Sequence, residues 1–119
     1  MYTLRIEQSF SAAHFLTNYH GKCENLHGHN YKVYVYITGT ELDKAGMLVD
    51  FGIAKQYCKK VLELLDHKNL NEIPEFANSP SAERIAHFIF DALVQAHPDI
   101  AWKAVDVFET ETSMARYEP

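Results

Sequence analysis

The sequence has little cysteine, no long apolar run and no excess of positive charge, and each shortage excludes a class of protein. Two cysteines, Cys23 and Cys58, are too few for a disulfide framework, and we expect both thiols to be free. No hydrophobic run approaches the length of a membrane span, and the first residues lack the apolar core of a signal peptide. We therefore expect a cytoplasmic protein with no membrane partner.

The charge balance is acidic. With 16 acidic residues against 11 lysines and arginines, the formal net charge is −5, which argues against nucleic acid as a partner. No repeat, linker or low-complexity segment divides the 119 residues. A hydrophobic content of 47% is ordinary for a globular protein, so we expect one domain over residues 1–119.

Hydrophobic periodicity predicts six elements. Apolar and polar residues alternate in the predicted strands, and apolar residues recur at helical spacing in the predicted helices. The predicted strands are residues 2–10, 32–38, 105–109 and 113–117, and the predicted helices are residues 52–65 and 80–97. The order β-β-α-α-β-β predicts an α+β fold, a four-stranded antiparallel sheet with two helices on one face. Neither sheet edge has a predicted cover, so we expect association between subunits.

Residues 66–79 are polar and include Pro74, which predicts a loop. The helix start is predicted at Ser79-Pro80. The apolar stripe predicted for the first helix consists of Ile53, Tyr57, Val61, Leu64 and Leu65.

Three histidines stand at a spacing that packing alone does not require: His14, then His27 and His29 in a His-Gly-His sequence. On an extended segment residues i and i+2 point to the same face, so His27 and His29 would share one side of a strand. His14 is near enough in sequence to add a third imidazole. Three protein ligands leave a tetrahedral zinc ion with an open position, which is typical of catalytic zinc. The competing interpretation is surface or core histidines without a metal.

Cys23 is separated from His27 by three residues. A nearby cation lowers the pKa of a thiol, which favours a working thiolate at this position. Two other interpretations stay open. Cys23 could be a fourth zinc ligand, which would close the site, or a small buried apolar residue.

Two carboxylates are further candidates. Asp66 directly precedes His67 at the end of the first predicted helix, where a carboxylate can orient an imidazole for proton transfer. A histidine favoured by the helix dipole explains the same position without any function. Glu109 lies on the apolar side of its predicted strand. A buried carboxylate needs a partner, either a ligand with N–H donors or an arginine such as Arg116.

Several short sequences, taken together, resemble the 6-pyruvoyl-tetrahydropterin synthase family. They follow the family's order and span nearly the whole chain: Ser11-Ala12-Ala13-His14, Cys23 to His29 with Asn30 and Tyr31, Val49-Asp50-Phe51, Leu65-Asp66-His67-Lys68-Asn69-Leu70, and Glu109-Thr110. The gap of three residues after the cysteine resembles the 6-carboxy-tetrahydropterin synthase branch of queuosine precursor biosynthesis. The pyruvoyl-forming branch typically has a longer gap.

The resemblance implies roles for the residues that match. The three histidines match zinc ligands, and Cys23 matches the catalytic cysteine. Asp66 and His67 match a partner dyad that, in this family, reaches in from a neighbouring subunit. The implied fold is the tunnelling fold, in which subunit sheets join into a barrel, usually as a homo-hexamer of two stacked trimers.

For the substrate, the resemblance implies a pterin triphosphate held by Glu109 at its guanidine-like edge. Ser81 stands where the family usually has a threonine that contacts the pterin. Four positions depart from the family pattern. Ala82 replaces a usual serine or threonine, Phe108 stands where relatives in this branch often have lysine, and Glu24-Asn25 replaces the common Gly-Arg.

The implied reaction converts 7,8-dihydroneopterin triphosphate to 6-carboxy-5,6,7,8-tetrahydropterin, with release of acetaldehyde and triphosphate. Zinc would act as a Lewis acid on the side-chain hydroxyls, while Cys23 abstracts a proton and His67 donates one. The first alternative is 6-pyruvoyl-tetrahydropterin synthase, in which the same residues eliminate triphosphate. The second is a pterin- or metal-binding module without catalysis, which would need neither Cys23 nor the Asp66–His67 dyad.

Overall fold

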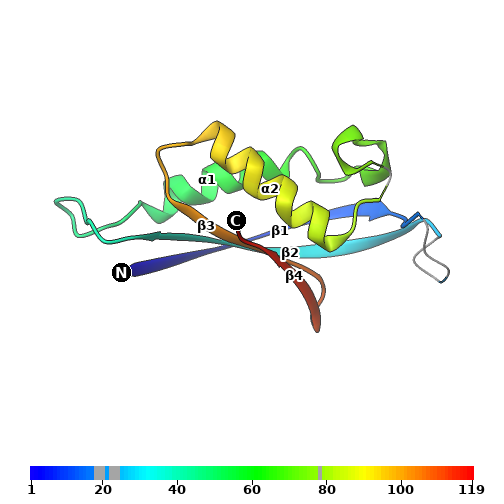
Figure 1. The fold of residues 1–119 in the computed structure, drawn as a ribbon, viewed down its shortest axis with the longest axis horizontal. Helices are drawn as coiled ribbons and strands as arrows, with labels where there is room; N and C mark the ends of the chain where they lie inside the picture. The colour runs from blue at the N-terminus through cyan, green and yellow to red at the C-terminus, as the bar shows by residue number, and fades with distance from the viewer. Residues whose placement is uncertain (18–20, 22–24, 78) are drawn as a thin grey trace.

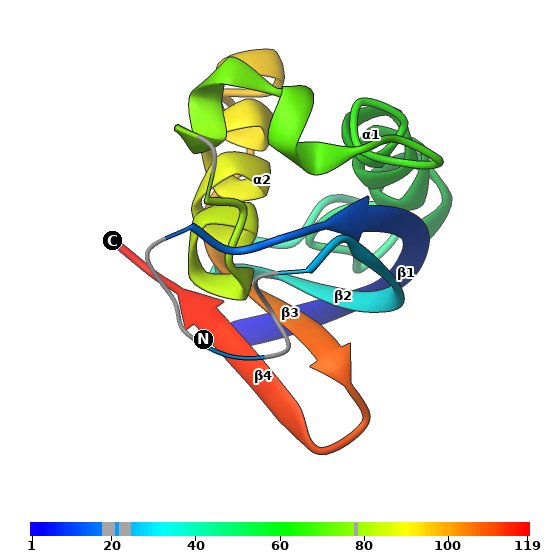
Figure 2. The same ribbon diagram turned by 90° about the vertical axis from the view of Figure 1, so that its right-hand side faces the viewer.

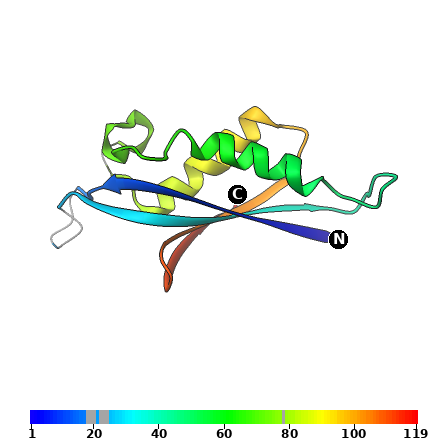
Figure 3. The same cartoon turned by 180° about the vertical axis from the view of Figure 1, so that it is seen from behind.

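The computed structural model describes residues 1–17, 21, 25–77 and 79–119. Its main elements, in the predicted order, are β1 (Tyr2–His14), β2 (His27–Gly39), α1 (Phe51–Leu62), α2 (Ala82–Ala96), β3 (Trp102–Thr110) and β4 (Ser113–Tyr117). The strands form an antiparallel sheet in the order β1-β2-β3-β4. Both helices cover the same face of this sheet (Figures 1 and 3). The predicted arrangement of sheet and helices is therefore confirmed.

The first two strands form a long ladder that reaches the histidines. Pairing runs without a break from Tyr2 opposite Gly39 to His14 opposite His27. The alternating pattern predicts only residues 2–10 of β1, because Ser11-Ala12-Ala13 interrupts the alternation of large and polar side chains. The strand continues because its partner β2 offers backbone groups along this whole length.

The core lies between the sheet and the two helices. Alternate residues of β1 and β2 point into it, among them Ile6, Phe10, Tyr31, Val33 and Val35. Helix α1 packs on β1, and α2 packs on β3 and β4 (Figure 2). None of the helices in the described part of the chain has the length and apolar character of a membrane span.

The buried face of α1 differs from the predicted stripe. Ile53 and Leu64 are 46% and 49% exposed. The buried residues of α1 are Ala54, Cys58, Val61 and Leu62, followed by Leu65. Small side chains at Ala54 and Cys58 let the helix approach the sheet, a preference that counting large apolar residues does not detect. Cys58 is a free thiol inside the core.

The segment between the helices is more ordered than predicted. It contains two short 3-10 helices, η2 (Leu70–Glu72) and η3 (Pro74–Phe76), which bury Leu70 and Phe76. Helix α2 begins at Ala82 rather than at Pro80, because the Ser81 hydroxyl is the N-cap and accepts a hydrogen bond from the Arg84 N–H at 3.3 Å.

One sheet edge is partly covered, contrary to expectation. The segment after α1 runs beside the end of β1. The His67 N–H donates to Ser11 O at 2.6 Å, and the Ala13 N–H donates to Lys68 O at 3.0 Å. Ala13 and Asn69 complete a parallel bridge. Residues 66–69 therefore pair with the last third of the β1 edge and leave its first residues open to other partners.

Candidate metal centre

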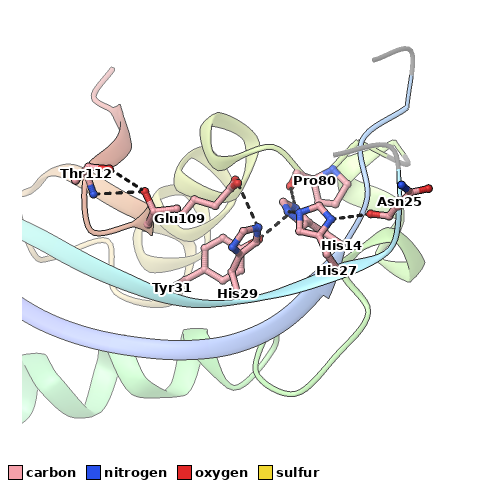
Figure 4. A network of polar contacts seen from close by, with 9 residues as sticks. His14, Asn25, His27, His29, Tyr31, Pro80, Glu109 and Thr112 are labelled. Carbon is pink, nitrogen blue, oxygen red and sulfur yellow. Dashed lines mark hydrogen bonds and ion pairs between the residues drawn. The ribbon is translucent and has the colours of Figure 1, made fainter. Parts of the chain in front are cut away.

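The sheet register gathers the three predicted histidines at one end of the helix-covered face. His14 lies opposite His27, and His29 lies opposite Ala12, so all three side chains share one face. The Nε2 atoms of His14 and His27 are 3.0 Å apart. Ring centroids are separated by 4.6 to 5.0 Å among the three imidazoles. Figure 4 shows the imidazoles converging.

Two backbone carbonyls fix the orientation of two of these rings. His14 Nδ1 lies 2.9 Å from Pro80 O, and His27 Nδ1 lies 2.6 Å from Asn25 O. A carbonyl oxygen can only accept, so Nδ1 carries the proton in both rings. Each Nε2 then presents a lone pair toward the other rings, as metal-bound histidines do when their second nitrogen is held by a carbonyl.

The surroundings favour neutral imidazoles. Burial lowers the pKa of His14, which is completely inaccessible to solvent, although the Pro80 carbonyl partly opposes this shift. Burial likewise lowers the pKa of His29, with Glu109 opposing. Tyr31 is a buried neighbour of the cluster, with its hydroxyl 3.1 Å from His14 Nδ1. Burial raises the pKa of this hydroxyl. Neutral imidazoles suit metal ligation.

A fourth group joins the histidines. Glu109 Oε1 lies 3.2 Å from His29 Nε2, and one ligand atom from each of the four residues lies within 4.8 Å of the others. The contact lacks hydrogen-bond geometry, so His29 Nε2 is a buried polar atom without a hydrogen-bond partner among the described residues. Three imidazole nitrogens and one carboxylate form a donor set that fits zinc.

The alternative partner considered for Glu109 is engaged elsewhere. Arg116 Nε and Nη2 donate to Asp106 at 2.6 and 2.9 Å, on the sheet face away from the helices. Asp106 also accepts from the Tyr36 hydroxyl at 2.9 Å. The sequence pattern predicts neither the burial of the Asp106 carboxylate nor the position of Glu109 beside the histidines. The position of Glu109 could have been anticipated from its strand, because Glu109 alternates in step with Val105 and Val107, whose side chains face the core.

The structure places the predicted dyad at the β1 edge rather than inside the histidine cluster. Asp66 Oδ1 accepts from the Ser11 N–H at 2.9 Å, and Asp66 Oδ2 lies 3.0 Å from His67 Nδ1. The Ser11 N–H lowers the pKa of the Asp66 carboxyl, helped by His67. His67 adopts a left-handed φ of 57°, and its side chain is 82% exposed. The carboxylate thus orients an imidazole that points into solvent.

The other predicted residues lie in different settings. Ser81 uses its hydroxyl oxygen to cap α2, next to the carbonyl that holds His14, and keeps its own proton to donate. Phe108 packs edge-on against Tyr34, with ring centroids 5.6 Å apart, away from the helices. Cys23 and Glu24 lie outside the described residues.

Comparisons with known proteins agree over nearly the whole chain. A family model described as 6-pyruvoyl tetrahydropterin synthase matches residues 3–119. The 6-carboxy-5,6,7,8-tetrahydropterin synthase of Synechocystis sp. is 38% identical, over 98% of this chain and 93% of the relative. The human 6-pyruvoyl tetrahydrobiopterin synthase is also 38% identical, over 92% of this chain and 86% of the relative. The solved structure of Caenorhabditis elegans 6-pyruvoyl tetrahydropterin synthase superposes with a TM-score of 0.88 at 30% identity, covering 99% of this chain and 95% of that one.

Proposed function

This chain belongs to the 6-pyruvoyl tetrahydropterin synthase family, and we propose that it is a zinc-dependent 6-carboxy-5,6,7,8-tetrahydropterin synthase. Its substrate is 7,8-dihydroneopterin triphosphate, and its products are the 6-carboxy pterin, acetaldehyde and triphosphate. The observation that carries the proposal is the convergence of three imidazole nitrogens and a carboxylate within 4.8 Å of one another. Together with the candidate thiol and the Asp66–His67 dyad found in the sequence, such a set supplies the groups that a metal-assisted lyase needs.

The choice of branch rests on one spacing. Relatives of both branches match at 38% identity, so overall similarity does not separate them. Three residues lie between Cys23 and His27, and this short gap supports the 6-carboxy branch. The second candidate is 6-pyruvoyl-tetrahydropterin synthase, which the similarity to the human relative favours equally.

His14, His27 and His29 would hold the metal through their Nε2 atoms. When bound, zinc supplies Lewis acidity, which makes the protons of substrate hydroxyl groups easier to remove. The carbonyls of Pro80 and Asn25 keep two of these imidazoles in the tautomer with a free Nε2. The protein therefore orients two of the proposed ligands in advance.

The remaining residues bind the ring and move protons. Glu109 accepts from the guanidine-like edge of the pterin, and the Ser81 hydroxyl adds one contact. Cys23, as a thiolate, takes a proton from the substrate side chain. His67, oriented by Asp66, returns a proton. The exposed imidazole at the β1 edge supports a role for this dyad in the site of a neighbouring subunit.

Assembly follows from the same geometry. We propose that sheets of neighbouring subunits join at the open edges of β1 and β4 into a barrel, as a homo-hexamer of two trimers. Such pairing satisfies the free backbone groups of both edges. We further propose a cytoplasmic location, because a reducing compartment keeps the Cys23 thiol from oxidation.

The test is a product assay. Zinc-loaded protein is incubated with 7,8-dihydroneopterin triphosphate, and acetaldehyde, triphosphate and pterin products are measured together. Acetaldehyde with a 6-carboxy product is the expected result. Triphosphate release with a pyruvoyl product and no acetaldehyde would assign the protein to the other branch. No turnover by a zinc-replete, folded protein would leave only binding and refute the proposed lyase activity.

A further inference from the structure

Glu109 lies against the histidine cluster, with one ligand atom from each of the four residues within 4.8 Å of the others, which holding the pterin ring alone does not require. Its Oε1 atom is 3.2 Å from His29 Nε2. The two side chains are 26% and 18% exposed, and Figure 4 shows the carboxylate directed at the imidazoles. Because the pair lacks hydrogen-bond geometry, a hydrogen bond between them does not explain the contact. A cation between the four ligand atoms would explain it.

We propose that Glu109 is the fourth metal ligand when no substrate is bound, and that the pterin ring draws this carboxylate away from the metal. Four protein ligands complete a tetrahedral zinc site, whereas three leave one position open. The resting site is then closed, and it opens only when the ring offers the carboxylate N–H donors instead. The identity of the incoming ligand rests on the proposed function. The coordination of the resting site does not.

The backbone at Glu109 is suited to such an exchange. The pairing of β3 with β4 shifts register between Phe108 and Thr110, and the pairing of β3 with β2 ends at Phe108. Glu109 therefore lies at a bulge-like irregularity outside both regular ladders, a feature that often redirects a side chain near a site. The following turn is held separately, because the Thr112 N–H donates to the Thr110 hydroxyl at 3.4 Å.

The exchange links two binding events. A ligand can shift an equilibrium only by its different affinity for the two states, and the ring contacts Glu109 only in the open state. The loss of the bond between Glu109 and the metal therefore offsets part of the free energy of ring binding. The hydroxyl groups of the substrate side chain meet an open coordination position only after the ring is bound. Substrate fragments that lack the ring edge would meet a closed site.

Cobalt substitution tests the coordination directly, because the visible spectrum of Co²⁺ reports ligand type and number. We would compare the wild-type protein with Glu109→Gln, and with Glu111→Gln as a control for an exposed acidic residue on the same hairpin. Glu109→Gln should bind Co²⁺ more weakly by a factor of about 10–100 or more, since even outer-shell changes cost about that much. Its spectrum should also change, whereas Glu111→Gln should match the wild type. Thermal melting of the metal-free variants verifies that each is folded.

The second arm adds 6-methylpterin, which has the ring edge but no side-chain hydroxyl. It should move the wild-type cobalt spectrum toward that of Glu109→Gln and leave the variant's spectrum unchanged. Unaltered cobalt affinity and spectrum in Glu109→Gln would overturn the inference while leaving the proposed function intact. A sulfur-to-cobalt charge-transfer band that disappears in Cys23→Ala would also overturn it, by giving the fourth position to Cys23. If the wild type binds no cobalt, both the inference and the proposed zinc site are wrong.

Discussion

The carbonyl of Pro80 connects one proposed metal ligand, His14, to a distant part of the chain. It lies 2.9 Å from His14 Nδ1, and the next residue, Ser81, caps α2. The same short segment thus orients a proposed zinc ligand and presents a proposed pterin contact. A shift of the α2 N-terminus would therefore disturb metal and substrate binding together.

Single substitutions separate metal binding from proton transfer. His27→Ala should lose zinc, because two remaining imidazoles cannot hold the ion at the same affinity. Cys23→Ala should keep zinc and lose turnover. Zinc content after dialysis and product formation are the two measurements. Zinc loss in Cys23→Ala equal to that in His27→Ala would make Cys23 a ligand, and a zinc-replete, active His27→Ala protein would remove the histidine assignment.

The buried histidines predict how the metal-free protein responds to pH. Burial lowers the pKa of His14 and His29 in the folded state, so the unfolded chain, with histidine pKa values of about 6.5, takes up protons first as the pH falls. The stabilisation of the folded state by these neutral imidazoles is complete above about pH 6.5. It is lost as the pH falls from there toward the lower pKa values that the two histidines have in the folded state. Melting temperatures of chelator-treated protein should therefore decrease over this window.

Substitution distinguishes these histidines from the rest. His14→Gln should reduce the pH dependence of the melting temperature, whereas His87→Gln, which changes an exposed histidine of α2, should preserve it. An identical pH profile in the wild type and His14→Gln would show that other groups cause the effect.

At the scale of elements, α1 depends on small residues and on the turn that follows it. The helix ends at Leu62, and the chain then turns so that Leu65 is fully buried while the adjacent Leu64 is 49% exposed. Helical spacing predicts both leucines in one stripe. The difference arises because the stripe assumes a helix that continues through residue 65.

These neighbouring leucines form a matched pair for a stability measurement. Leu65→Ala should lower the free energy of unfolding by about 2–5 kcal/mol, through lost burial and the cavity left behind. Leu64→Ala should change it by about 0.5 kcal/mol or less, as for other surface positions. Urea unfolding monitored by circular dichroism provides both values. Similar losses in the two variants would mean that Leu64 is buried in the assembled protein.

The segment that follows α1 does more than connect two helices. Residues 66–69 pair with the β1 edge, and Asp66 is held there by the Ser11 N–H. This pairing positions the His67 imidazole on the outside of the sheet edge. The element that carries the proposed proton donor is thus fixed to the strand that carries His14, and its imidazole is 82% exposed.

For the whole molecule, this arrangement predicts active sites shared between subunits. His27→Ala and His67→Ala should each be inactive alone. In mixed oligomers some sites combine an intact metal centre from one subunit with an intact dyad from the other. Random mixing should restore activity in about a quarter of the sites. The measurement is product formation after refolding the two variants together.

Size-exclusion chromatography of differently tagged variants establishes that mixed oligomers have formed. If verified mixed oligomers remain inactive, the dyad and the histidines act within one chain. A monomeric wild-type protein that is fully active would contradict the shared site and the barrel together.

Much of the fold follows from local sequence, because alternation and helical spacing depend only on nearby residues. The order of elements, the antiparallel sheet and the common face of His27 and His29 are all predictable in this way. The resemblance adds candidate roles for Cys23, Asp66, His67 and Ser81, which remain predictions.

Only the tertiary structure decided which distant groups meet. Arg116 pairs with Asp106 rather than Glu109, Glu109 faces His29, and the β1 edge receives the Asp66 segment. These contacts join residues from different elements, and in some of them several residues of the same chemical type could have been the partner. Such choices depend on register, bulges and helix ends, which local periodicity does not determine because they are set by packing across the whole sheet.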